Sequence, residues 1–261
     1  MLPFFSTDPT GRIEPAAFVA HYAAHRGLAV ESFGVRQTVV VTLIPALERR
    51  LLRRLGAPPP HPHPIQCQSL YNPEGFPCSI IASPMGAPMA VMLLEQLVAL
   101  GARRFLYLGF CGALAPSYRI GDGFMPSQAI REEGTSYHYV PAALVLRSSM
   151  RLNASLQAAA QEQGVAVGMG PIWTTDAPFR ETPQKIRQFQ AAGVHAVDME
   201  MAALFAVAHY RGCEVAALLL VSDECYHATW KPGFGVPRLR QACQDAVEVT
   251  AAAGTRLASS V

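Results

Sequence analysis

The sequence has no apolar stretch long enough to cross a membrane. Its strongest candidate, residues 89–100, is interrupted by Glu95, whereas a membrane-spanning helix needs about 20 apolar residues. The opening residues, MLPFFSTDPTGR, lack the charged start and apolar segment of a secretory signal. We therefore expect no membrane partner, no signal peptide and a cytoplasmic location.

Charge is also scarce. Only 15% of the 261 residues are charged, the net charge is +2, and the arginines are scattered. Because nucleic-acid-binding domains concentrate positive charge, no nucleic-acid partner is predicted. The six cysteines form no C-x-x-C pair, and several lie within apolar runs. This spacing indicates buried thiols in a reducing compartment, so neither disulfides nor a metal site are predicted.

Apolar residues are abundant, at 51% of the chain, which is enough for a sizeable core. We expect strands near residues 37–43, 78–82, 104–108, 123–130, 165–173, 196–198 and 215–221, and helices near residues 15–27, 45–55, 87–100, 148–163, 182–192, 199–211 and 237–253. This alternation predicts an α/β fold: a single domain over residues 1–261 with a mixed, mostly parallel central sheet flanked by helices. Residues 1–14 are expected to be irregular.

Residues 193–224 form a distinctive strand–helix–strand unit. Residues 199–211 carry apolar side chains at helical spacing, Gly212 ends that helix, and residues 215–221 are apolar throughout, as in a fully buried strand. Glu200 is expected in the first turn of the helix, where the helix dipole favours an anion. Asp223 is expected just after the second strand, at the edge where open α/β sheets bind ligands.

The sequence V-D-M-E at residues 197–200, followed by S-D at residues 222–223, resembles the nucleoside phosphorylase and nucleosidase superfamily. That superfamily includes purine nucleoside phosphorylase, uridine phosphorylase and methylthioadenosine nucleosidase. The similarity extends over residues 38–250. It implies a nucleoside phosphorylase-like fold, cleavage of the N-glycosidic bond of a small-molecule nucleoside, and a homo-oligomer (dimer, trimer or hexamer).

The resemblance assigns roles to the residues of these motifs. Asp223 matches the acid that protonates the departing base, which requires a neutral carboxyl with a pKa raised by burial. Glu200 matches the carboxylate that accepts hydrogen bonds from the ribose hydroxyls. Met199 matches the methionine that packs on the sugar, and Val197 belongs to the same substrate-binding motif. Without the motif, Asp223 is an ordinary loop or capping aspartate.

Two further segments match substrate contacts. Residues 174–180, T-T-D-A-P-F-R, resemble the loop whose phenylalanine, here Phe179, stacks on the base. Residues 83–88, S-P-M-G-A-P, resemble an S/T-G-M-G-x-P segment, which places Met85 and Gly86 at the sugar. Gly86 then lets the backbone approach closely, although Pro84 stands where a glycine is usual.

The family's phosphate site is altered. Its strand arginine and the Ser or Thr of the following G-(S/T)-x-G segment correspond to Tyr107 and Phe110, with Gly109 between them retained. The earlier G-D-P-x-R loop reads L-I-P-A-L at residues 43–47, without its glycine and arginine. Because phosphate is a dianion that needs charge-assisted donors, these changes favour water as the nucleophile.

The nucleosidase branch activates that water with a glutamate, and Glu48 falls at the matching position; otherwise Glu48 belongs to a solvated helix face. The sequence therefore predicts an enzyme that cleaves a ribonucleoside, with a purine base, by hydrolysis in preference to phosphorolysis. Phosphorolysis, with phosphate as co-substrate, is the alternative. Two others are a nucleoside- or base-binding protein without turnover and an unrelated α/β sugar-binding module. No cofactor is predicted.

Overall fold

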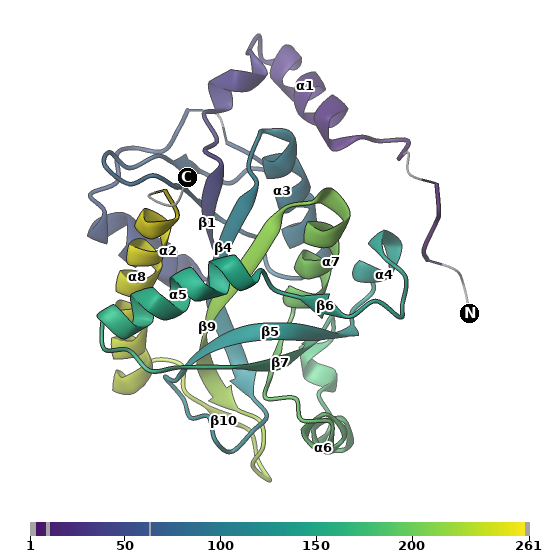
Figure 1. The fold of residues 1–261 in the computed structure, drawn as a ribbon, viewed down its shortest axis with the longest axis vertical. Helices are drawn as coiled ribbons and strands as arrows, with labels where there is room; N and C mark the ends of the chain where they lie inside the picture. Colours follow the sequence, from purple (N-terminus) through teal and green to yellow (C-terminus); the bar gives the residue numbers. More distant parts are fainter. Residues whose placement is uncertain (1–3, 9–10, 63, 259–261) are drawn as a thin grey trace.

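The computed structural model describes residues 4–8, 11–62 and 64–258. Within these residues, helices cover both faces of a ten-stranded sheet (Figure 1). The α/β class predicted from the alternating segments is confirmed. None of the described helices combines the length and the apolar character needed to span a membrane.

The strands are β1 (Thr38–Thr42), β2 (Leu70–Tyr71), β3 (Ser79–Ala82), β4 (Arg104–Ala113), β5 (Gly123–Glu132), β6 (Leu146–Arg147), β7 (Val167–Thr175), β8 (Ala196–Asp198), β9 (Glu214–Glu224) and β10 (Lys231–Pro232). The α-helices are α1 (Pro15–His25), α2 (Pro45–Arg54), α3 (Ala87–Ala99), α4 (Ser136–Tyr139), α5 (Met150–Glu162), α6 (Pro183–Ala191), α7 (Met201–Arg211) and α8 (Pro237–Ala258). Two short 3₁₀ helices, η1 (Val30–Phe33) and η2 (Pro178–Arg180), complete the described elements.

The sheet is mixed, and its longest ladders are parallel. β4 pairs in parallel with β1 and with β9, and β5 pairs in parallel with β7. The strand order is β10-β9-β5-β7-β8-β4-β1-β3-β2, and an additional β9–β4 pairing joins β4, β9, β5, β7 and β8 into a closed ring. β8 completes the ring because it runs parallel to β7 and antiparallel to the end of β4. The ring therefore brings the carboxyl ends of β4 and β9 together beside β8.

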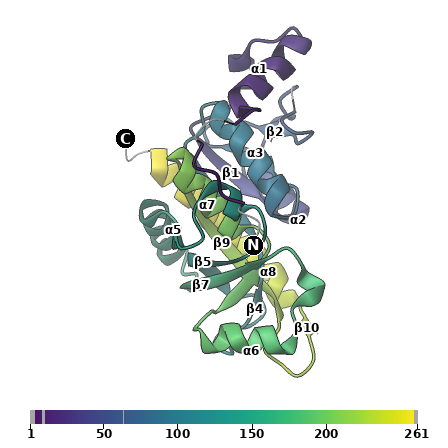
Figure 2. The same ribbon diagram turned by 90° about the vertical axis from the view of Figure 1, so that its right-hand side faces the viewer.

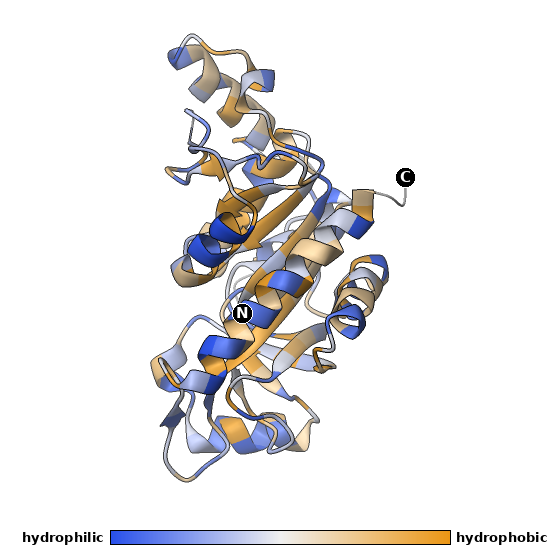
Figure 3. Ribbon diagram, turned by 90° about the vertical axis from the view of Figure 1, so that its left-hand side faces the viewer, coloured by the Kyte–Doolittle hydropathy of each residue, from blue (hydrophilic) through white to orange (hydrophobic). Residues whose placement is uncertain are grey.

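Apolar cores lie on both faces of the sheet. One core packs α3 and α7 against the strands, with Leu93 and Phe205 buried in it. The other packs α2, α5 and α8, with Leu47 and Leu156 buried. Figure 2 shows α3 and α5 on opposite sides of the sheet, and Figure 3 shows hydrophobic strands inside and hydrophilic residues on the outer sides of the helices.

A smaller cluster holds α6 against the end of the sheet. Trp173 of β7 is fully buried there and stacks on Phe189 of α6, with 4.3 Å between ring centroids. The other buried members of this cluster are Leu114, Val194, Val197 and Cys225. Residues 181 and 182 connect η2 to α6.

The side chain of Asp198 sets where α7 begins. Its carboxylate accepts hydrogen bonds from the backbone N–H groups of Glu200, at 2.8 Å, and Met201, at 2.7 Å. Because these are the first unpaired donors of the helix, α7 starts at Met201 and Glu200 is its N-cap. The predicted start at Met199 was therefore wrong by two residues, and Glu200 precedes the first turn.

Two strands run further than the sequence indicated. β4 includes residues 109–112, which were expected to follow the strand, and β9 includes Asp223, which was expected just beyond it. The parallel ladder between them continues to Ala113 and Glu224, so each strand supplies the hydrogen bonds that extend the other. The two-residue strands β2, β6 and β10 and the single-turn helix α4 were not predicted.

Candidate active site

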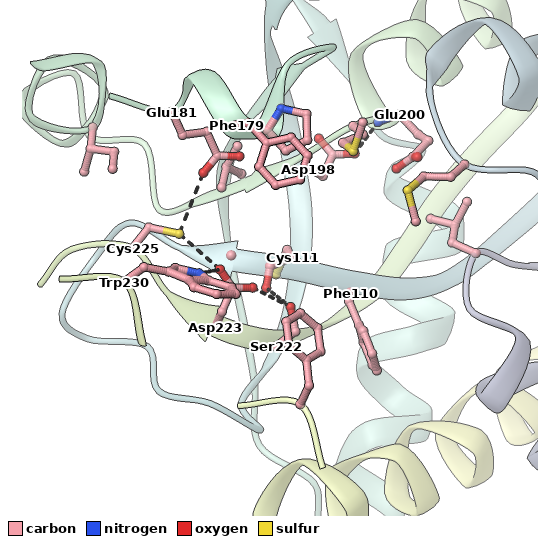
Figure 4. A pocket seen from close by; sticks show the side chains of 18 of the residues that line it. Phe110, Cys111, Phe179, Glu181, Asp198, Glu200, Ser222, Asp223, Cys225 and Trp230 are labelled. Carbon is pink, nitrogen blue, oxygen red and sulfur yellow. Dashed lines mark hydrogen bonds between the residues drawn. The ribbon is translucent and has the colours of Figure 1, made fainter. Parts of the chain in front are cut away.

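A cavity of about 510 Å³ opens at the carboxyl ends of β4 and β9 (Figure 4). Its walls come from segments far apart in the chain: the residues after β1, the end of β4, η2, the junction of β8 with α7, and the end of β9. Four carboxyl groups border it, those of Glu181, Asp198, Glu200 and Asp223. Among the described residues that line it there is no lysine or arginine. The cavity is therefore acidic and apolar.

The carboxylates of Asp198 and Glu200 have different hydrogen-bond partners. One oxygen of Asp198 accepts a hydrogen bond from the Thr174 hydroxyl at 2.6 Å, and the other caps α7. The Asp198 carboxylate is thus engaged within the protein and holds the helix start in place. Glu200 accepts a hydrogen bond at Oε1 from the backbone N–H of Gly86, at 2.7 Å, and its carboxylate borders the cavity.

The buried position of Glu200 disfavours its charged form. Only 6% of the residue is exposed. Burial raises the pKa of Glu200, and the negative charge of Asp198 raises it further. A buried carboxylate is held in its charged form by added hydrogen-bond donors or cations. Glu200 is therefore an acceptor suited to hydroxyl groups of a ligand.

Asp223 reaches the cavity through a β-bulge. The register between β4 and β9 slips at Ser222, so that Gly112 lies opposite Asp223, and bulges of this kind redirect side chains. A Cβ atom at Gly112 would lie 3.2 Å from Oδ2 of Asp223, so the missing side chain allows the close approach. Asp223 accepts hydrogen bonds from the Ser222 hydroxyl, at 2.6 Å, and from the Trp230 indole N–H, at 2.8 Å.

Cys225 lies between two carboxyl groups. Its Sγ is 3.2 Å from Oδ2 of Asp223 and 3.8 Å from Oε2 of Glu181 (Figure 4). Burial raises the pKa of the Cys225 thiol, and both carboxylates raise it further, so Cys225 is a hydrogen-bond donor and not a thiolate nucleophile. Burial, followed by the charge of Asp223, raises the pKa of Glu181 to about 7.

Aromatic rings surround the mouth of the cavity. Phe179 of η2 lines the cavity and is fully exposed, and Trp230 and Phe234 are each 60% exposed. A ligand that buries these rings gains free energy, because apolar surface is removed from water. Exposed apolar side chains gathered around one opening are typical of a ligand site. A flat apolar group fits between such rings.

Residues 47–258 match the family model of the phosphorylase superfamily. The chain belongs to the phosphorylase superfamily. Guanosine phosphorylase from Halorubrum lacusprofundi is 28% identical over 175 residues, covering 67% of this chain and 73% of that protein. Uridine phosphorylase from Treponema pallidum is 30% identical over 213 residues, covering 76% of this chain and 80% of that protein.

A solved structure has the same fold. The crystal structure of purine nucleoside phosphorylase from Toxoplasma gondii in complex with immucillin-H matches with a TM-score of 0.78, covering 90% of this chain and 95% of that one, at 20% identity. Enzymes of the phosphorylase superfamily like these relatives cleave nucleoside N-glycosidic bonds as pentosyltransferases, and this chain is an enzyme of that kind. They need no cofactor, and phosphate is their co-substrate.

The cavity of this phosphorylase-superfamily chain collects most of the residues singled out in the sequence: Met85, Phe110, Phe179, Val197, Met199, Glu200 and Asp223 all border it. Gly86 and Gly109 do not. Gly86 donates a backbone hydrogen bond to Glu200. A Cβ atom at Gly109 would lie 2.7 Å from Cδ1 of Leu43, so Gly109 makes room for that side chain. Glu48 lies on α2 outside the described cavity wall, and burial raises its pKa. Its catalytic role stays a prediction.

The positions that correspond to the superfamily's phosphate site form an apolar wall. Leu43, Ile44 and Phe110 border the cavity, and Leu47 is fully buried in the core beneath α2. Tyr107 is 1% exposed and does not border the cavity. Its hydroxyl has no hydrogen-bond partner among the described residues. Leu47 and Tyr107, at the positions matched to the family's arginines, therefore do not border the cavity.

Sequence reasoning missed Glu181, Cys225 and Trp230. Glu181 follows Phe179 by two positions, so its place beside the base loop was a signal within the sequence. Cys225 and Trp230 lie two and seven residues after Asp223, but neither belongs to the motif by which Asp223 was recognised. Among the described residues, no group of three or more histidine, cysteine or acidic side chains is placed to hold a metal ion.

Proposed function

We propose that this chain cleaves the N-glycosidic bond of a purine ribonucleoside and transfers the ribosyl group to phosphate. The observation that carries the proposal is the shared cavity of Glu200 and Asp223, with Phe179 at its mouth. One carboxyl group serves the sugar and the other the base. The bond between sugar and base then lies in the cavity between them.

Glu200 binds the ribose. Its ionised carboxylate accepts hydrogen bonds from two sugar hydroxyls, and these donors offset the cost of a buried charge. Met199, Val197 and Met85 line the same cavity and cover the sugar with apolar surface. As the bond breaks, positive charge grows on the sugar ring, and the nearby carboxylates stabilise it.

Phe179 stacks on the base, and a carboxyl group at the same end protonates it. Asp223 and Glu181 both border that part of the cavity, and protonation neutralises the departing base. A purine fits this arrangement better than a pyrimidine, because its five-membered ring carries a second nitrogen that takes the proton while the glycosidic bond breaks.

Phosphate is the proposed nucleophile because relatives of this chain are named guanosine, uridine and purine nucleoside phosphorylase. A phosphate dianion needs cationic or N–H donors, and none of the described lining residues is a lysine or arginine. We expect a second copy of the chain, in a homo-oligomer, to supply the missing cation.

Hydrolysis is the second candidate, and one observation favours it. Leu43, Ile44 and Phe110 offer no donor side chain at the corresponding phosphate site. Water needs no cationic pocket, and Glu48 is the residue predicted to activate it.

The test measures free base from adenosine, guanosine, inosine and uridine, with and without phosphate. Purine release that requires phosphate and yields ribose 1-phosphate supports the proposal. Free ribose formed in phosphate-free buffer supports hydrolysis instead, and Glu48→Gln then abolishes that release while the control Glu74→Gln, exposed and outside the cavity wall, retains it. If no nucleoside is cleaved but calorimetry detects nucleoside binding, both candidates fail and the chain is a binding protein.

A further inference from the structure

We propose that Glu181 is the residue that gives the departing base its proton, and that Asp223 acts as the charged partner that keeps Glu181 protonated. The proposal rests on the proposed cleavage of a nucleoside. It concerns which of the two carboxyl groups at the base end is the acid. Paired carboxyl groups in unlike surroundings commonly divide the roles of acid and charged partner.

Asp223 is surrounded by hydrogen-bond donors. Its Oδ1 accepts a hydrogen bond from the Ser222 hydroxyl at 2.6 Å. Its Oδ2 accepts one from the Trp230 indole N–H at 2.8 Å and one from the Cys225 thiol at 3.2 Å. Three donors therefore occupy the carboxylate oxygens of Asp223, which is the arrangement of a hydrogen-bond acceptor.

Glu181 has fewer hydrogen-bond donors around it than Asp223. Glu181 lines the cavity, and the Cys225 thiol, just after β9, lies 3.8 Å from its Oε2. In the described part of the chain, no lysine or arginine lies within ion-pair distance of it. Two carboxyl groups linked through one thiol do not both ionise readily, because like charges repel.

The described ionisable groups that act on Glu181 are Asp223 of β9, Cys225 just after β9, and Glu132 at the end of β5. The nearby cation Lys185 of α6 forms an ion pair with Glu132. Burial and then Asp223 raise the pKa of Glu181 to about 7. Glu181 is therefore protonated below neutral pH and loses its proton as the pH rises through that value.

The proposed step conserves atoms and charge. The glycosidic bond breaks and its electron pair goes to the base, while the Glu181 proton passes to a ring nitrogen of the base. The sugar carbon forms its new bond to the oxygen of phosphate, the nucleophile of the proposed function. The neutral base leaves, and Glu181 regains a proton from solvent before the next turnover.

The experiment compares pH profiles of kcat/KM for the unmodified protein, Glu181→Gln and Asp223→Asn on the best purine nucleoside. The unmodified protein should lose activity as the pH rises through about 7. Glu181→Gln should lower kcat about 100-fold and remove that decline. Asp223→Asn should move the decline to lower pH, because removing its charge lowers the pKa of Glu181. Arg187→Gln, exposed on α6 and outside the cavity wall, is the control and should keep the original profile.

Thermal unfolding of each variant shows whether it is folded, and Glu181→Asp, which retains a carboxyl group, should restore part of the pH-dependent activity. A Glu181→Gln variant that keeps the decline and changes only KM would overturn the proposal, since Glu181 would then be a binding contact. An Asp223→Asn variant that loses all turnover, beside an active Glu181→Gln variant, would also overturn it and make Asp223 the acid. Failure of the unmodified protein to cleave any nucleoside would instead refute the proposed function.

Discussion

The backbone N–H of Gly86 donates a hydrogen bond of 2.7 Å to Oε1 of Glu200, which joins the start of α3 to the start of α7 across the cavity wall. Gly86 adopts φ +92° and ψ +149°. This backbone conformation is almost confined to glycine. The orientation of the Glu200 carboxylate, the proposed ribose acceptor, therefore depends on a backbone geometry that other residues disfavour.

Gly86→Ala should reduce both stability and substrate affinity. No atom lies within 4 Å of the added Cβ, so the cost is backbone strain, about 1–3 kcal/mol of unfolding free energy. KM for the nucleoside should rise about tenfold, since a hydrogen bond to a charged group is weakened. Gly101→Ala is the control: its φ is +100° and its Cβ also meets no atom, so it should lose stability but keep KM. An unchanged KM in Gly86→Ala would mean that this contact does not orient Glu200.

Glu200→Gln should stabilise the protein and impair binding. Burial and the charge of Asp198 raise the pKa of Glu200. In the unfolded chain this carboxyl group loses its proton at the pH usual for glutamate, whereas in the folded protein it keeps the proton to higher pH. Stability contributed by this group is therefore lost as the pH rises from roughly 5 to 8. The Tm advantage of Glu200→Gln should grow over the same range in calorimetry, while its KM exceeds that of the unmodified protein. A Tm difference independent of pH would contradict the raised pKa.

Phe179→Ala should weaken nucleoside binding without weakening the fold. The ring is fully exposed, so its removal costs little unfolding free energy. Loss of stacking on the base should raise KM about tenfold. Met150→Ala removes another exposed apolar side chain, at the start of α5 and away from the cavity, and should leave KM and Tm unchanged. Equal KM values for the two variants would exclude Phe179 as the base contact.

Tyr107→Phe should raise the free energy of unfolding by about 1 kcal/mol, because a buried hydroxyl without a partner is costly. The hydroxyl has no partner among the described residues and does not border the cavity. Urea unfolding measures the effect as a higher midpoint with an unchanged slope. In the control Tyr137→Phe, the lost hydroxyl donates to the Arg131 carbonyl at 3.2 Å, so no gain is expected. A higher KM for phosphate in Tyr107→Phe would show that this hydroxyl serves the nucleophile.

Much of the fold was predictable because its signals are local. The helices now assigned as α2, α3, α6 and α8 begin at or next to prolines, and apolar spacing marked their extent. The two-residue strands β2, β6 and β10 were not predictable, because a period of two cannot be recognised in two residues. The start of α7 was misplaced because it is set by hydrogen bonds from the first N–H groups of the helix to the Asp198 side chain. A change in apolar spacing does not mark it.

The candidate site divides in the same way. Asp223, Glu200 and Phe179 were recognised from short motifs, since each lies within a few residues of its motif partners. Glu181 was missed because it lies between η2 and α6, whereas Asp223 lies on β9, and the two residues are linked in space through Cys225. Hydrolysis was preferred from the missing phosphate ligands, whereas the relatives of this chain are phosphorylases.

Local signals in the chain were enough to predict the alternation of strands and helices, the acidic motifs within residues 193–224, and neutral residues at the positions matched to the family's phosphate-binding arginines. The shared cavity of Glu181, Glu200 and Asp223 became visible only in the folded chain. The donors to Asp223 are its neighbours in sequence, but Cys225 and Glu181 are 44 residues apart. Burial and contacts of that kind depend on how the sheet and its loops come together, so a local pattern of residues does not record them.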